Sequence, residues 1–148
     1  MVDIKELRIC DLVYIPSLSM AAYGEKYVLF CIEEIYTEDD EYKVLCHCDT
    51  KEGYNLTEDV SLSEIEFIPL TEELLLKCGF TKEYYGFSCD IMELSYGRFL
   101  CNDDTDKDNL FLSINNAEYT ISKVSLKYLH QLQNIYYDLT GNELDVKL

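Results

Sequence analysis

The chain has 148 residues, and its 29 Asp and Glu against 12 Lys and Arg give a formal net charge of −17. Because 48% of the residues are hydrophobic and 13 are Tyr, enough apolar surface exists to offset the entropy of ordering, which excludes an intrinsically disordered chain. The sequence has no run of about 18 apolar residues, which excludes a transmembrane helix. It also has no cluster of Lys and Arg, which excludes direct binding to nucleic acid or to an anionic membrane.

The first half of the chain consists of short strand-like segments separated by turns. Asp11 interrupts the apolar alternation of the first segment, which indicates a turn or bulge, and Pro16 ends that strand. The stretch 49–63 is less regular, with Gly53 and Asn55 as turn residues. Strands are predicted at Leu7–Ile15, Tyr27–Tyr36, Tyr42–Cys48 and Ile65–Ile68, with an acidic turn at Thr37–Glu41.

The second half begins after Pro69, which marks a boundary between two lobes. A helix is predicted over Thr71–Phe80, with Thr71 as its N-cap and Gly79 in the left-handed position that follows a helix. An acidic loop is predicted over Asn102–Asn109. Strands are predicted at Tyr85–Tyr96, Arg98–Cys101, Leu110–Ile114 and Glu118–Ile121.

The last predicted element is an amphipathic helix over Leu126–Leu139. Ser125 is its expected N-cap, and Gly141 is suited to the position after its end. Its apolar stripe, widened by Ile135, consists of Leu126, Leu129, Leu132, Gln133, Tyr136 and Leu139.

These elements predict an α+β protein with two lobes that form one compact domain. Residues 1–68 form a β-rich lobe, a small bent sheet or barrel, and residues 69–148 form a β-hairpin lobe packed by the C-terminal helix. The polar N-terminus lacks the features of a signal peptide, and the seven Cys are an odd number with apolar neighbours. Reduced thiols and a cytoplasmic location are therefore expected.

No metal site or cofactor is predicted. In Cys46-His47-Cys48 a strand would point the two thiols to one face and the imidazole to the other, and no second close Cys pair is present. The run from Asp104 to Asp108 has the spacing of the first calcium ligands, but Asn109 and Asn115 stand where an EF-hand needs Gly and Glu. A solvated loop explains that run better.

No catalytic motif is present, so the chain is not expected to be an enzyme. The carboxylate pairs Glu33–Glu34 and Glu64–Glu66 arise by chance in so acidic a chain, and the six Gly are isolated. A polar strip on the last helix could bind a partner or simply face solvent, with Gln133 at the edge of the core. Tyr residues are enriched at interfaces. The aromatic and polar binding candidates are Tyr84, Tyr85, His130, Gln131, Asn134 and Tyr137.

Three segments resemble a known family. They are Leu7–Tyr14 (LRICDLVY), Ser61–Phe80 (SLSEIEFIPLTEELLLKCGF) and Leu126–Leu144 (LKYLHQLQNIYYDLTGNEL), roughly a third of the chain. They are similar to the hallmark segments of a family of uncharacterised proteins from phages and integrated mobile elements of gut bacteria. Cys10 stands where that family usually has Gly, which implies an altered turn or bulge. The resemblance implies a phage or mobile-element origin and no established activity.

The leading hypothesis is a non-enzymatic interaction protein that binds a protein partner through an acidic surface. One form of it is an inhibitor that presents carboxylates to a nucleic-acid-binding or defence protein, where phosphates would otherwise sit. The alternatives are a homo-oligomeric, structural or virion-associated protein and a small enzyme or nucleotide-binding protein. The acidic binding candidates are Glu38, Asp39, Asp40, Glu41, Asp103, Asp104, Asp106 and Asp108. Ordinary solubility is the competing explanation of the charge.

Overall fold

The computed structural model describes residues 3–16, 18, 29–49, 55–96, 109–114 and 125–147. Within these residues the chain forms two antiparallel sheets, short helices and one longer helix near the C-terminus, so the predicted α+β class is confirmed. The chain divides into two compact units. The first unit is Met1–Ile68 with Leu129–Glu143, and the second is Pro69–Tyr128 with Leu144–Leu148.

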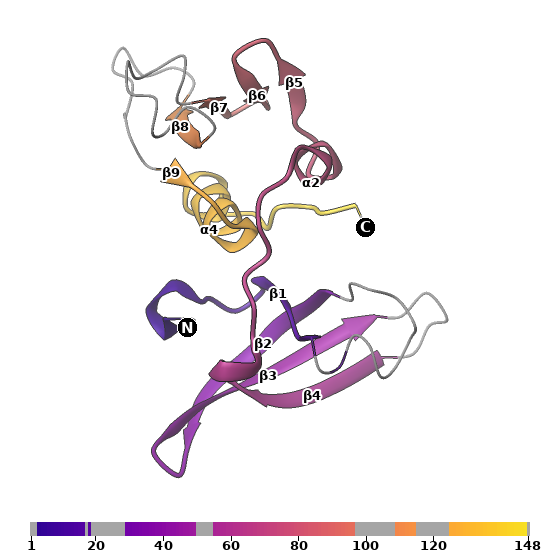
Figure 1. Cartoon of the computed structure of the whole chain (residues 1–148), viewed down its shortest axis with the longest axis vertical. Helices are drawn as coiled ribbons and strands as arrows, with labels where there is room; N and C mark the ends of the chain where they lie inside the picture. Colours follow the sequence, from indigo (N-terminus) through magenta and orange to yellow (C-terminus); the bar gives the residue numbers. More distant parts are fainter. Residues whose placement is uncertain are drawn as a thin grey trace. The chain divides into compact units, whose positions relative to one another are not determined.

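The first unit contains a curled, four-stranded sheet with the strands in sequence order (Figure 1). A bulge lies between Ile32 and Glu34 in the second strand, and bulges increase the local twist of a sheet. A single antiparallel bridge between Tyr14 and Glu66 brings the chain back to the free edge of the first strand. The elements are η1 (Ile4–Glu6), β1 (Leu12–Tyr14), β2 (Leu29–Glu38), β3 (Glu41–Asp49), β4 (Asn55–Ser61) and η2 (Leu62–Glu64).

Strand β4 corrects the sequence prediction for residues 49–63, which expected no regular element there. Its sequence mixes polar and apolar residues, and Asn55 is a typical turn residue. Pairing with β3 over its whole length overrides these local signals. The predicted closing strand at Ile65–Ile68 is reduced to the Tyr14–Glu66 bridge.

The core of the first unit lies on one face of its sheet. Alternate residues of each strand point inward, as the period of two requires, so Val44, Cys46 and Cys48 of β3 are buried while His47 points to the other face. This arrangement confirms the two-sided geometry expected for Cys46-His47-Cys48. The fully buried members of this core are Val13, Ile15, Phe30, Ile32, Val44 and Cys46.

The C-terminal helix α4 (Leu129–Thr140) belongs to the first unit, whereas the sequence analysis assigned it to the second lobe. It starts three residues later than predicted, because Ser125 and Leu126 form a strand rather than an N-cap and a first turn. Leu129 and Leu132 are buried as expected, but Leu139 is exposed. Gly141 follows the helix with a φ of +70°, as predicted, and its N–H donates to the carbonyl of Tyr137 at 2.7 Å.

The second unit contains a five-stranded antiparallel sheet, also in sequence order, and helix α2 (Glu72–Lys77). The predicted N-cap is confirmed, because the Thr71 hydroxyl accepts a hydrogen bond from the Leu74 N–H at 3.2 Å. Gly79 has a φ of +84°, as its predicted place after the helix requires. The strands are β5 (Thr81–Glu83), β6 (Gly86–Ser88), β7 (Met92–Tyr96), β8 (Leu110–Ile114) and β9 (Ser125–Leu126).

The segment Tyr85–Tyr96 is two strands rather than the single strand predicted, and β5 was not predicted. Gly86 allows β6 to approach β7 closely, because a Cβ at this position would lie 1.8 Å from the carbonyl oxygen of Leu94. The strands predicted at Arg98–Cys101 and Glu118–Ile121 lie outside the described residues. Among the described residues, no helix has the length and apolar character needed to span a bilayer.

Candidate functional site

The β2–β3 hairpin ends in four consecutive acidic residues. Glu38 and Glu41 are direct partners across the hairpin, and Asp39 and Asp40 form its turn. The two Asp have φ values of +51° and +62°. Two central residues with positive φ are the pattern of a type I′ turn, in which Asn-Gly is the favoured pair. All four side chains are exposed, so we call these four residues the acidic turn.

The acidic turn works against the stability of its own hairpin. Asp adopts the left-handed region less readily than Gly, and like charges directly opposite each other across two strands are destabilising. Exposed positions accept almost any polar residue, so the fold itself does not require carboxylates here. Departures from local preference of this kind are expected where a sequence serves binding rather than folding.

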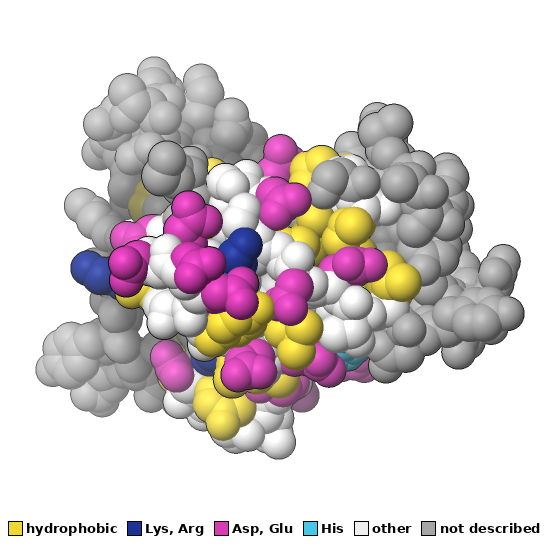
Figure 2. Space-filling view, turned by 90° about the horizontal axis from the view of Figure 1, so that it is seen from below, with side chains coloured by type: hydrophobic (Ala, Val, Ile, Leu, Met, Phe, Trp, Pro, Cys, Tyr) yellow, Lys and Arg dark blue, Asp and Glu magenta, His cyan; other side chains and the backbone are white. Residues whose placement is uncertain are grey.

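Further carboxylates lie on the same sheet. Between Glu33 and Lys43 the hairpin carries six carboxylates and one Lys. Glu34 of β2 and Asp59 of β4 both pair with Leu45 of β3, one on each side of it. The space-filling view shows the face that is lowest in Figure 1, where the acidic turn lies. In Figure 2 carboxylates are spread over the described part of this face, with few Lys or Arg among them.

Two side chains on the outer face of this sheet lie close to carboxylates. The Tyr36 hydroxyl donates to Asp59 at 2.6 Å, and this hydrogen bond raises the pKa of Tyr36 to about 12. His47 Nδ1 lies 3.0 Å from Glu33 Oε1. Asp59 is therefore held in place by Tyr36, while the four residues of the acidic turn project from the end of the hairpin.

The polar strip predicted on α4 was expected to bind a partner or to face solvent, but two of its residues lie in the interior. His130 is 1% exposed and Gln133 is 2% exposed, so both are buried and neither faces solvent. The His130 ring stacks on Phe67 with centroids 4.0 Å apart, and its Nε2 lies 3.6 Å from a Glu6 oxygen. Burial lowers the pKa of His130, which favours the neutral imidazole.

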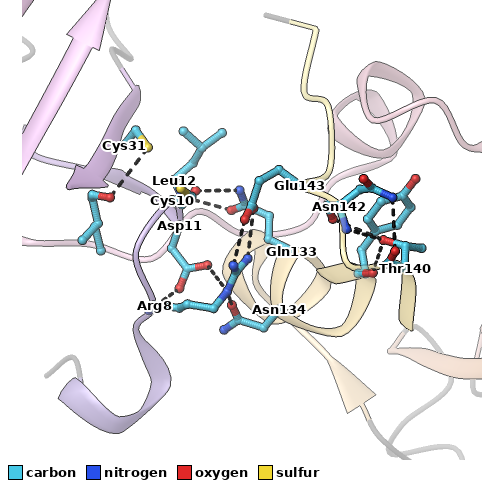
Figure 3. Close-up of polar contacts among 12 residues, drawn as sticks. Arg8, Cys10, Asp11, Leu12, Cys31, Gln133, Asn134, Thr140, Asn142 and Glu143 are labelled. Carbon is cyan, nitrogen blue, oxygen red and sulfur yellow. Dashed lines mark hydrogen bonds and ion pairs between the residues drawn. The ribbon is translucent and has the colours of Figure 1, made fainter. Parts of the chain in front are cut away.

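Gln133 and Asn134 hold α4 against the segment that leads into β1. Gln133 accepts a hydrogen bond from the Leu12 N–H at 3.0 Å and donates to the Cys10 carbonyl at 3.3 Å. Asn134 accepts from Arg8 Nε at 2.6 Å (Figure 3). These side chains therefore serve contacts within the first unit.

Arg8 and Asp11 complete this cluster, a role that the local sequence did not predict. Arg8 donates to both carboxylate oxygens of Glu143, at 2.9 and 3.1 Å, and its guanidinium lies 4.4 Å from the centre of the Tyr137 ring. Asp11 is fully buried and accepts from the Arg8 N–H at 2.7 Å. Burial raises the pKa of Asp11 to about 6. The one signal in the sequence was the Asp that interrupts an apolar strand.

The remaining predicted residues do not gather at one place. Tyr84 is 87% exposed at the turn between β5 and β6 in the second unit, and Tyr85 beside it is partly buried. Gln131 is partly buried on α4, and Tyr137 is exposed beneath the Arg8 guanidinium. Asp103, Asp104, Asp106 and Asp108 lie outside the described residues.

In the described part of the chain, no group of three or more His, Cys, Asp or Glu side chains is arranged to hold a metal ion. Comparisons of the chain with protein-family models, with curated proteins and with solved structures find no match. The function is therefore inferred from the residues themselves.

Proposed function

We propose that the chain is a non-enzymatic acidic interaction protein that binds a basic protein partner through the acidic turn. The observation that carries this proposal is the run Glu38–Glu41, where exposed like charges occupy a turn whose geometry favours Asn-Gly. Ordinary solubility requires surface charge but not like charges directly opposite each other across a hairpin. A binding role accounts for charge at that position.

The partner class that fits best is a protein that binds nucleic acid. Such a protein has clustered Lys and Arg that contact phosphates, and carboxylates on a firmly paired hairpin present negative charge to the same side chains. The resemblance to proteins of phages and mobile elements adds a biological setting, in which the partner is a host nucleic-acid-binding or defence protein. Binding of this kind is steered by charge and weakens steeply with salt.

The test is affinity purification of the tagged full chain from lysate of the bacterial host, followed by mass spectrometry. The test variant carries Glu38→Gln, Asp39→Asn, Asp40→Asn and Glu41→Gln, which removes four charges and keeps side chains that suit the turn. The matched control carries Glu66→Gln, Asp90→Asn, Asp138→Asn and Asp145→Asn, which removes four exposed carboxylates elsewhere.

We expect a captured partner that is retained by the control, lost from the test variant, released at high salt and displaced by duplex DNA. Equal capture by parent, control and test variant would exclude the acidic turn as the binding surface. A partner that persists when duplex DNA is added in excess would exclude competition for a phosphate-binding site. Light scattering on the purified chain tests the alternative of self-assembly, which predicts a particle larger than the monomer.

A further inference from the structure

Two free thiols meet where the chain enters the first sheet. Cys10 lies two residues before β1 and Cys31 lies in β2, where it pairs with Leu12. The N–H of Cys10 donates to the carbonyl of Ile32, the neighbour of Cys31, at 2.8 Å. Both residues are among those drawn in Figure 3. Both residues are partly exposed.

Cys10 has a backbone conformation that is unusual for a residue with a side chain. Cys10 has a φ of +72°, a left-handed conformation that breaks the alternation of side chains expected for a strand. The Cys31 Sγ lies 3.8 Å from the carbonyl oxygen of Ile32, the same oxygen that accepts the hydrogen bond from the Cys10 N–H. Burial, together with the nearby Cys10, raises the pKa of Cys31 to about 11. Cys31 is therefore protonated at neutral pH and is a slower nucleophile than an unperturbed thiol.

The other described cysteines lack this arrangement. Cys46, Cys48 and Cys78 are buried, and burial raises the pKa of Cys46 to about 12 and that of Cys78 to about 11. Cys89 is as accessible as Cys10 but lies in the second unit. It therefore serves as an internal control for simple exposure.

We propose that Cys10 and Cys31 form a thiol–disulfide exchange site that closes to an intramolecular disulfide on reaction with a low-molecular-weight disulfide such as oxidised glutathione. This inference is independent of the acidic turn and of any partner. Thiol pairs that react reversibly in reducing compartments are catalytic or redox-sensing rather than structural. A site of this kind makes the stability of the first unit depend on the thiol–disulfide balance of its surroundings.

The exchange proceeds in two steps. The Cys10 thiolate attacks one sulfur of oxidised glutathione, forms a mixed disulfide and releases one glutathione thiolate. Cys31 then loses its proton to solvent and attacks the Cys10 sulfur, which releases the second glutathione. Two protein thiols are oxidised to one disulfide, and one oxidised glutathione is reduced to two glutathione molecules.

Closure would link the segment before β1 to β2. The disulfide closes the loop of residues 10–31, and a crosslink of that length restricts the unfolded chain. Gln133 of α4 already binds the carbonyl of Cys10, so the bond also fixes the segment against which α4 packs. We expect the oxidised chain to unfold at a temperature roughly 10 °C above that of the reduced chain.

The test treats the folded full chain with oxidised glutathione, quenches with acid, alkylates the remaining thiols and maps the peptides by mass spectrometry. The parent and Cys89→Ser should both yield a peptide pair joined through Cys10 and Cys31. Cys10→Ser and Cys31→Ser should instead stop at a glutathione adduct on the remaining thiol. Reduced glutathione in excess should restore both thiols in the parent.

Two results would overturn the proposal. One is a parent that carries glutathione on Cys10 or Cys31 without the joined peptide pair. The other is a Cys10–Cys31 bond that forms only in urea and not in the folded chain, since the native geometry would then play no part. Thermal unfolding gives a second readout, because only variants that retain both thiols should show the rise on oxidation.

Discussion

Replacing Asp11 with Asn should remove a pH dependence from the stability of the first unit. Asp11 is fully buried, and burial raises its pKa from 3.8 to about 6 in the folded chain. An acid whose pKa is raised on folding binds its proton more tightly in the native state. Its stabilising contribution is therefore fully present below the unfolded pKa and is lost as pH rises through about 6.

The size of the effect follows from the difference between the two pKa values. The whole difference corresponds to roughly 3 kcal/mol, of which about 1.4 kcal/mol falls between about pH 5.0 and about pH 7.5. Arg8 and Glu143, which interact with Asp11, are partly exposed, so solvent screens their charges. We therefore expect the free energy of unfolding to change by about 1 kcal/mol between these pH values. Lower pH is avoided because the sequence pI is about 4.2.

The assay is urea unfolding of the parent and of Asp11→Asn at several pH values across this range. The free energy of unfolding of the parent relative to the variant should rise by about 1 kcal/mol from about pH 7.5 to about pH 5.0. Asp138→Asn, which removes an exposed carboxylate from the same unit, corrects for the loss of one negative charge. A difference between parent and Asp11→Asn that does not vary with pH would refute the reasoning.

Three other variants test the backbone and the acidic turn. Cys10→Gly should stabilise the chain by about 0.5–1 kcal/mol, because relief of the left-handed conformation exceeds the added entropy of Gly; a loss of stability in urea would contradict this. Gly86→Ala should cost about 3 kcal/mol or more, since its Cβ would lie 1.8 Å from the Leu94 carbonyl oxygen; an unchanged unfolding midpoint would show that β6 and β7 separate easily. The acidic-turn variant should be as stable as the parent or up to about 1 kcal/mol more stable, because like charges no longer face each other; destabilisation in urea would show that the carboxylates serve folding.

Local sequence signals predicted the turns and helix ends whose structure depends on residues close in the chain. The acidic turn separates two apolar segments, and Thr71 with Gly79 bound a helix, so each of these elements was predicted close to its place. Strand β4 was missed because its stability comes from pairing with β3 rather than from its own residues. Ser125 carries the signal of an N-cap, but pairing of β9 with β8 takes precedence over it.

The polar cluster could not be predicted, because its members are far apart in the chain. Arg8 and Asp11 meet Asn134 and Glu143 only after the first unit has formed. In the sequence, His130 looks like a surface residue of an amphipathic helix, and Gln133 looks like a residue at the edge of the core. Their burial depends on which unit the helix joins, and helical periodicity does not carry that information.

The assignment of α4 to the first unit has a consequence for synthesis on the ribosome. The chain leaves this unit after Ile68 and re-enters it at Leu129, whose N–H donates to the Ile68 carbonyl at 2.8 Å. Everything between these residues must be translated before Gln133 and Asn134 are available to the segment around Cys10. A nascent chain that stops at Tyr128 therefore contains its first sheet but lacks the α4 side chains that bind the segment before β1. The residues that surround the Asp11 carboxylate from α4 are translated more than a hundred residues after Asp11 itself.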